Sequence, residues 1–342
     1  MFQWSSYFEY NPIDPLLSSN DEILKHFVKQ DLLNRKEKDL FFLENAPVVQ
    51  KIIKKQQPNG SWKSVSKNQL RYPAINYSLI ETWRNFRILV EKYRLTKENP
   101  AVRKASEYIF SCQTDFGDFR GILADQFAMY YTGALASLLN QAGYEKDPRL
   151  NNALEWLLST RQDDGGWLAN YLMSLNLTNK EVNRLTSQKA STITERDATR
   201  PSSHNWTGMV IRAFANHPQY RNRPEAHQAG KLLKKAFFLK DKNYTSYQDA
   251  GYWVKFEYPY WWNNLVSAMD SLSNLGFLAS DPDIKRGLDW FHDHQNQSGL
   301  WNISYSSKHQ VKNSPKSKNM QLWVSFQICR IFQRFLDANR NF

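Results

Sequence analysis

Side chains that could bind or react gather where predicted loops lead into predicted helices. Tyrosine and tryptophan predominate in this set, with a few charged residues: Arg71, Tyr72, Tyr77, Asp125, Tyr130, Arg200, His204, Trp206, Tyr258, Tyr260, Trp261 and Trp262. Aromatic faces suit an apolar ligand or a cation. Arg71, Arg200 and Lys318 could receive an anionic head group. The same residues also suit helix caps and core packing, and both interpretations stay open.

Motifs of common catalytic chemistries do not occur in the sequence. There is no Cys-x-x-Cys or His-Glu-x-x-His spacing for a metal, no Gly-x-Ser-x-Gly turn and no phosphate-binding glycine-rich loop. We therefore expect no metal and no cofactor, and the sequence assigns no catalytic residue.

A recurring helix ending organises the chain. Its four copies combine a glutamine, a glycine and an aromatic residue: Gln57, Gly60 and Trp62; Gln113, Gly117 and Phe119; Gln162, Gly165 and Trp167; Gln295, Gly299 and Trp301. Glycine adopts the left-handed conformation that ends a helix, and a glutamine amide can bond to helix-terminal backbone groups. These residues are therefore predicted to be structural, and a degraded copy is predicted at 224–240.

The fourth copy resembles the repeat of the prenyltransferase and squalene/terpene cyclase superfamily. Its pattern is a basic and a small residue, an aromatic residue, then Gln, Gly and Trp, matched here by Arg286-Gly287, Trp290, Gln295, Gly299 and Trp301. The resemblance implies an all-α fold, an α/α toroid of about five to six helical hairpins whose inner helices surround a central cavity. The chain is most similar to uncharacterised prokaryotic members.

The two reactions known from that superfamily are not supported by matching residues. Its cyclases use an Asp-x-Asp-Asp acid motif, whereas Asp163-Asp164 lacks the first aspartate. Its protein prenyltransferases hold zinc with Asp, Cys and His, and neither Cys112 nor Cys329 lies in a matching context. The resemblance therefore implies an apolar, isoprenoid-like ligand in an aromatic-lined cavity, with no assigned reaction.

Two other function classes remain open. A non-catalytic toroid could bind another protein through its faces, although the sequence names no partner. A carbohydrate-active lyase or hydrolase could draw on Arg200, His204, Asn205, Tyr258 and Tyr260. An open aromatic cavity would favour the small-molecule hypothesis over protein binding, whereas a groove with two carboxylates or a His-Tyr-Arg cluster would favour the carbohydrate-active one.

Apolar periodicity and Pro or Gly corners divide the chain into alternating helices. Inner helices are predicted at 74–94, 124–142, 205–216, 261–277 and 319–338, and outer helices restart at about Pro100, Asp147, Pro224 and Asp281. Residues 1–45 are predicted to be an arm, extended over 1–20, with short helices, and 46–342 to be the toroid domain. The polar stretch 171–203 is predicted to be a lid or an insertion.

Composition limits the cellular setting. The formal net charge is +12, but Lys and Arg are scattered and no nucleic-acid-binding module is evident. No stretch approaches the ~20 apolar residues of a membrane span, and the first residues do not resemble a signal peptide. With only two cysteines, a cytoplasmic protein without a nucleic-acid partner is expected.

Overall fold

A computed structural model describes residues 3–35, 41–189, 192–241, 249–308 and 310–337. Every regular element in these ranges is helical, and β-pairing is limited to isolated bridges. The predicted all-α fold class is therefore confirmed. The chain forms two compact units: a terminal unit, Met1–Asp39 with Gly230–Phe342, and a middle unit, Leu40–Ala229.

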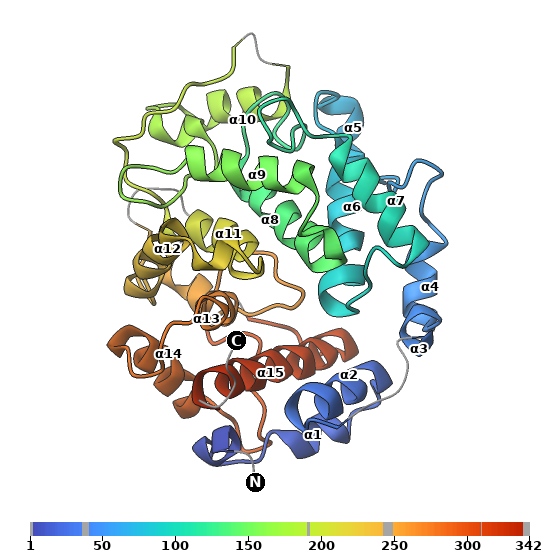
Figure 1. The fold of residues 1–342 in the computed structure, drawn as a ribbon, viewed down its shortest axis with the longest axis vertical. Helices are drawn as coiled ribbons and strands as arrows, with labels where there is room; N and C mark the ends of the chain where they lie inside the picture. Colours follow the sequence, from blue (N-terminus) through green and yellow to red (C-terminus); the bar gives the residue numbers. More distant parts are fainter. Residues whose placement is uncertain (1–2, 36–40, 190–191, 242–248, 309, 338–342) are drawn as a thin grey trace. The chain divides into compact units, whose positions relative to one another are not determined.

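The middle unit contains the helices from α3 to the first half of α12 (Figure 1). They are α3 (Phe41–Glu44), α4 (Pro47–Ile53), α5 (Asn68–Arg71), α6 (Tyr77–Arg87), α7 (Pro100–Phe110), α8 (Met129–Leu139), α9 (Pro148–Ser159), α10 (Asn179–Ser187), α11 (His204–Ala215) and α12 (Pro224–Lys235). Helices α6 and α8 each continue into a π turn, over Ile88–Lys92 and Asn140–Tyr144.

The terminal unit combines both ends of the chain. Its helices are α1 (Ile13–Leu17), α2 (Glu22–Phe27), α13 (Leu265–Asn274), α14 (Pro282–Asp293) and α15 (Pro315–Leu336), with 3-10 turns at Gln3–Tyr7 and Ala250–Val254. In Figure 1 the orange helix α13 lies beside the long red helix α15, against which it packs.

Three outer helices begin with the same capping chemistry. Asn99, Asp147 and Asp281 each precede a proline and accept a hydrogen bond from a backbone N–H of the first turn, at 3.0, 2.9 and 3.0 Å. Proline is tolerated there because its missing N–H has no intrahelical partner to lose. The predicted starts of these helices are thus confirmed.

Burial marks α8 and α11 as interior helices. Helix α11 is buried along almost its whole length, as is α8, whereas α7, α9 and α14 keep exposed faces. A helix that is buried on all sides belongs to an interior layer. Helices α8 and α11 approach closely, since a Cβ on Gly133 would lie 2.8 Å from Val210 Cα. Across α7, α8, α9 and α11 exposed and buried helices therefore alternate, as in an α/α fold, and the closed ring with a central cavity remains a prediction.

The expectation of an extended arm over residues 1–20 is wrong. Gln3–Tyr7 forms a 3-10 turn and Ile13–Leu17 forms α1. Asn11 Oδ1 accepts a 3.0 Å hydrogen bond from the Ile13 N–H, and Pro15 lies in the first turn of α1, where proline is tolerated. The prolines that indicated an extended chain instead start a helix.

Each copy of the recurring ending turns through a left-handed glycine. The φ angles are +88° at Gly60, +102° at Gly117, +97° at Gly165 and +81° at Gly299. In three copies the glycine is pressed against the backbone of another segment: a Cβ would lie 2.1 Å from the Lys104 carbonyl oxygen, 2.6 Å from that of Asn152 and 2.5 Å from that of Asn11. A side chain is excluded at these positions by both conformation and space.

The aromatic residue of each copy joins the outer helix to an inner helix. The indole N–H groups of Trp62, Trp167 and Trp301 donate to carbonyl oxygens ten residues earlier, at 2.9, 2.7 and 2.6 Å. The backbone N–H of each aromatic residue donates to a hydroxyl of an inner helix, namely Thr82, Thr132, Thr207 and Ser325, at 3.1, 3.2, 2.9 and 3.0 Å.

The glutamine amides span neighbouring segments. Gln113 Nε2 donates to the carbonyl oxygens of Gly117 and Arg149, both at 2.8 Å, and Gln295 Nε2 to those of Tyr10 and Gly299, at 2.8 and 3.0 Å. In the first copy Gln56, not Gln57, makes the equivalent pair. Gln162 Nε2 donates instead to the backbone carbonyl oxygens of Asp197 and Arg200, at 2.7 and 2.9 Å.

Substituting the turn glycines tests how much their close approach to the neighbouring backbone contributes to stability. Gly276 also has a positive φ, of +78°, but no atom lies within 4 Å of a Cβ built there. We expect Gly276→Ala to lower the free energy of unfolding by about 1 kcal/mol, and Gly60→Ala by at least ~3 kcal/mol, because only the second also meets a carbonyl. Urea denaturation checks this, and equal losses would contradict it.

Removing one hydroxyl tests the link to the inner helix. Thr132→Val keeps the side-chain shape but leaves the buried N–H of Phe119 unbonded, so we expect a loss of ~1–3 kcal/mol. Thr132→Ser is the matched control, since Ser325 fills this role in the fourth copy, and it should cost less than about 1 kcal/mol. Chemical denaturation in which valine and serine are equally destabilising would argue against the bond.

Candidate ligand-binding site

An aromatic segment precedes α13 in the terminal unit. Tyr258 and Tyr260 are buried, with ring centroids 5.2 Å apart. Tyr258 stacks on Trp323 of α15 at 5.9 Å and 14° between planes. Trp261 and Trp262 follow at 6.3 Å from each other and keep intermediate exposure. The structure thus brings all four predicted residues of this unit together, two of them partly open to solvent.

The segment is fixed at both ends. Trp323 donates its indole N–H to Asp21 Oδ2 at 2.8 Å, and Asp21 also caps α2 through the Leu24 N–H. Asn264 caps α13 by accepting from the Ser267 N–H at 3.1 Å. The aromatic rings are therefore held near the first residues of two helices, α2 and α13.

Two arginines lie beside the tyrosines and were not found by sequence analysis. Arg330 Nε lies 3.1 Å from Asp31 Oδ2, and Arg334 donates to Asp270 and, at 2.7 Å, to Ser273 Oγ. Burial opposes both charges: it lowers the pKa of Arg334, whereas Asp31 and Asp270 outweigh it and raise the pKa of Arg330. Two arginines one turn apart on a helix that is mostly apolar were the available signal.

A second aromatic cluster lies in the middle unit. The ring centroid of Tyr130 on α8 lies 4.7 Å from that of Trp206 on α11 and 4.0 Å from that of Tyr131. The ring of Tyr131 in turn lies 5.0 Å from that of Trp83 on α6. Trp83, Tyr130 and Trp206 are only 1%, 7% and 8% exposed. Burial raises the pKa of both phenols. This cluster packs the inner helices together and offers little accessible surface.

Other predicted residues of the middle unit are dispersed. Arg71 is exposed, with its guanidinium 5.1 Å from the ring centre of Tyr72, and Tyr77 begins α6. Arg200 is exposed and pairs with Asp197 at 3.1 Å.

The remaining two predicted residues, Asp125 and His204, lie on different segments of the middle unit. The Asp125 carbonyl oxygen accepts a 3.3 Å bond from Arg120, and His204 is the first residue of α11.

The stretch predicted to be a lid or an insertion contains α10 and a firmly attached end. Gln126 Nε2 donates to the Thr192 carbonyl oxygen at 3.1 Å, and its Oε1 accepts from the Thr194 N–H at 3.1 Å. The Ser203 N–H donates to Trp167 at 3.0 Å. These bonds fix the segment from Thr192 to Ser203 against the middle unit.

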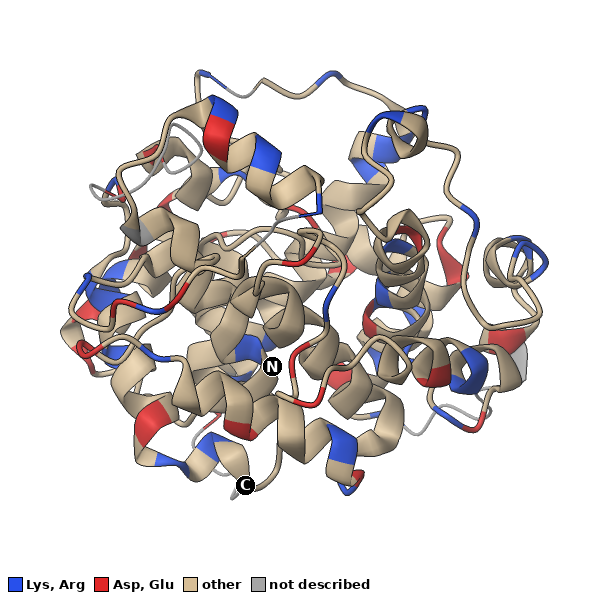
Figure 2. Ribbon diagram, turned by 90° about the horizontal axis from the view of Figure 1, so that it is seen from above, with Lys and Arg blue, Asp and Glu red and all other residues tan. Residues whose placement is uncertain are grey.

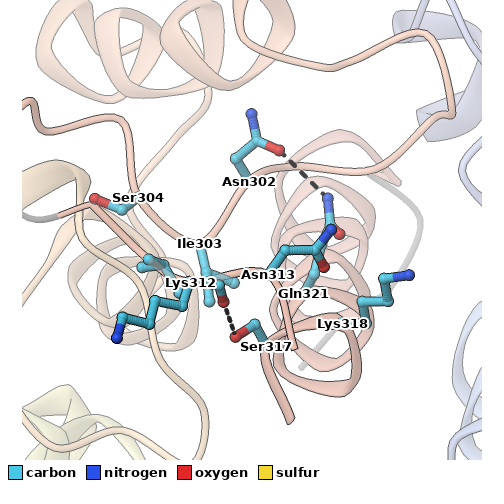
Figure 3. A pocket seen from close by; sticks show the side chains of 9 residues that line it. Asn302, Ile303, Ser304, Lys312, Asn313, Ser317, Lys318 and Gln321 are labelled. Atoms are coloured by element: carbon cyan, nitrogen blue, oxygen red, sulfur yellow. Dashed lines mark hydrogen bonds between the residues drawn. The ribbon is translucent and has the colours of Figure 1, made fainter. Parts of the chain in front are cut away.

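A polar pocket of about 350 Å³ lies at the start of α15 (Figure 3). Lys312 and Lys318 line it, and Figure 3 shows their side chains directed away from each other. Gln321 Nε2 is 3.4 Å from Asn302 Oδ1, and Ser317 Oγ donates to the Lys312 carbonyl oxygen at 2.7 Å. The predicted anion-binding residue Lys318 thus belongs to a polar, exposed pocket distinct from the aromatic segment.

Charge is spread along the elements of the chain. Figure 2 shows Lys and Arg interleaved with Asp and Glu. Within the described ranges, no group of three His, Cys, Asp or Glu side chains could hold a metal ion. None of the helices in those ranges combines the length and apolar character needed to cross a bilayer.

Comparisons with known proteins give fold-level likeness. No protein-family model matches the sequence, and no curated protein matches it. Similar solved structures include a polysaccharide lyase (14% identity, 88% of each chain covered, TM-score 0.44). A protein from Actinoplanes is 13% identical over 85% of this chain and 86% of its own, with a TM-score of 0.42.

The type II terpene cyclase MstE from Scytonema is 13% identical over 85% of this chain and 98% of its own, with a TM-score of 0.31. Because these three TM-scores are below 0.5, the likenesses do not argue for any activity of this chain.

The raised pKa values of Tyr130 and Tyr131 in the middle unit predict a pH dependence. Their raised pKa values mean that the folded state keeps protons that the unfolded chain releases near pH 10. Their contribution to stability is therefore complete below pH 10 and declines above it, by up to about 1.4 kcal/mol per pH unit for each tyrosine. Urea denaturation between pH 8 and 11 should show a steeper decline for the native protein than for Tyr130→Phe, and parallel declines would contradict the raised pKa of this buried phenol.

Proposed function

We propose that this protein binds an apolar, isoprenoid-like small molecule against the aromatic segment Tyr258 to Trp262. The main supporting observation is that Trp261 and Trp262 are partly exposed directly after the buried pair Tyr258 and Tyr260. Aromatic side chains elsewhere, such as Trp83 and Trp206, are almost completely buried and serve as core. An accessible aromatic surface held by two helix ends is the arrangement expected of a preorganised apolar site.

The chemistry of this segment suits binding more than proton transfer. Its tryptophans carry no titratable group, and indole offers only an N–H donor. Apolar contact contributes about 25 cal/mol per Å² of buried surface, so affinity should rise with the length of the hydrocarbon chain. The superfamily resemblance of the repeats supports the same ligand class, and membership of that superfamily is part of this proposal.

A chain-length series tests the proposal. Geraniol, farnesol and geranylgeraniol should raise the melting temperature in increasing order, because each adds apolar surface. Trp261→Ala and Trp262→Ala should weaken geranylgeraniol binding by roughly tenfold each, corresponding to ~1.4 kcal/mol. Trp290→Ala is the matched control, a tryptophan of intermediate exposure on α14 in the same unit, and it should leave binding unchanged.

Several outcomes would overturn the proposal. One is the absence of any thermal shift with all three alcohols, and another is equal loss of binding in the Trp290→Ala control. A shift with uronic-acid oligosaccharides and none with prenyl alcohols would replace the proposal with the carbohydrate-active alternative.

A further inference from the structure

Three side chains with hydrogen-bond donors form one stripe along α15. Gln327, Arg330 and Arg334 are spaced by three and four residues, which places them on the same face of the helix. Arg330 Nη1 donates to Gln327 Oε1 at 2.9 Å, and the charge of Arg330 acts on Arg334. The three groups therefore form a single cluster.

The cluster has more donors than its protein partners use. Arg330 uses Nε toward Asp31 and Nη1 toward Gln327, whereas Arg334 uses Nε toward Ser273 and Nη2 toward Asp270. The other amino nitrogen of each guanidinium makes no hydrogen bond with the described residues. Gln327 is 1% exposed, and its Nε2 likewise has no partner among them.

Buried donors are normally paired in native structures. Here a buried amide donor without a partner lies beside two guanidinium groups that each use only part of their donors. This arrangement indicates that a ligand supplies the missing acceptor. Arg330 and Arg334 keep 28% and 14% side-chain exposure, which leaves the cluster within reach of such a ligand. Planar guanidinium groups are suited to carboxylates and phosphates.

The net charge around the cluster favours a carboxylate over a phosphate. Asp31 and Asp270 balance the two arginines, so the cluster has many donors and no net charge. A diphosphate would bring several negative charges close to two carboxylates, which disfavours it. A single carboxylate needs hydrogen bonds more than counter-charge, and its two oxygens can accept several of them.

We propose that Gln327, Arg330 and Arg334 bind the carboxylate of the ligand, which is therefore a long-chain monocarboxylic acid such as a fatty acid or a carboxylated isoprenoid. This inference rests on the proposed function, because the buried Tyr260 interacts electrostatically with both arginines and the buried Tyr258 with Arg330. The exposed Arg71 and Arg200 and the divergent Lys312 and Lys318 lack such a cluster of unused donors.

Affinity for chain-matched probes tests the head-group assignment. Dodecanoate, 1-dodecanol and dodecyl phosphate are titrated into the full-length protein by calorimetry. Dodecanoate should bind about tenfold or more tightly than dodecanol, and more tightly than dodecyl phosphate. Gln327→Met keeps the side-chain volume and removes one donor, so it should reduce dodecanoate affinity about tenfold while dodecanol affinity stays the same.

Two further variants keep the test decisive. Arg334→Met with Asp270→Asn removes a donor without leaving a buried charge, and it should also lower dodecanoate affinity alone. The double variant Lys312→Met, Lys318→Met should bind dodecanoate like the native protein.

Each contrary result has its own meaning. Equal binding of dodecanoate and dodecanol, no change in Gln327→Met, or tighter binding of dodecyl phosphate would overturn the carboxylate assignment and leave the apolar site standing. Loss of binding in the double lysine variant would move the head group to the polar pocket. If neither dodecanoate nor dodecanol binds, the proposed function itself falls together with this inference.

Discussion

Left-handed glycines pressed against the backbone of neighbouring segments hold the rest of the structure in place. At Gly60, Gly117 and Gly299 a Cβ would lie within 2.6 Å of a carbonyl oxygen. Because no side chain intervenes, the turn can lie flat on the next segment while the aromatic residue behind it turns inward. The backbone N–H of the aromatic residue donates a hydrogen bond to a Thr or Ser hydroxyl on an inner helix. Outer helix, turn and inner helix are thus fixed as one unit.

Local chemistry made much of the fold predictable. Asn-Pro and Asp-Pro pairs mark the starts of outer helices, since the cap and the proline both act within one turn. The sequence does not show which glutamine of the first repeat joins the neighbouring segments, because Gln56 and Gln57 are identical neighbours. Only the hydrogen bonds of Gln56 to Gly60 and Ala101 distinguish them. The N-terminal arm was mispredicted because Pro15 reads as a helix breaker unless the helix is known to begin just before it.

The candidate site was partly visible in the sequence. Four aromatic residues between 258 and 262 stand out without any coordinates, and the structure places them together. The arginines do not stand out, because they occur late in a long helix where charged residues usually face solvent. Their partners, Asp31 and Asp270, come from distant parts of the sequence. Only tertiary structure shows that these charges are paired beside the tyrosines.

A crystal structure with 12-bromododecanoic acid tests the central claim most directly. The account predicts the carboxylate within about 3 Å of Gln327 Nε2 and the two guanidinium groups, with the bromine marking a chain that runs along the aromatic segment of the same unit. Anomalous density for bromine in the polar pocket between Lys312 and Lys318, or a carboxylate bound away from α15, would contradict it.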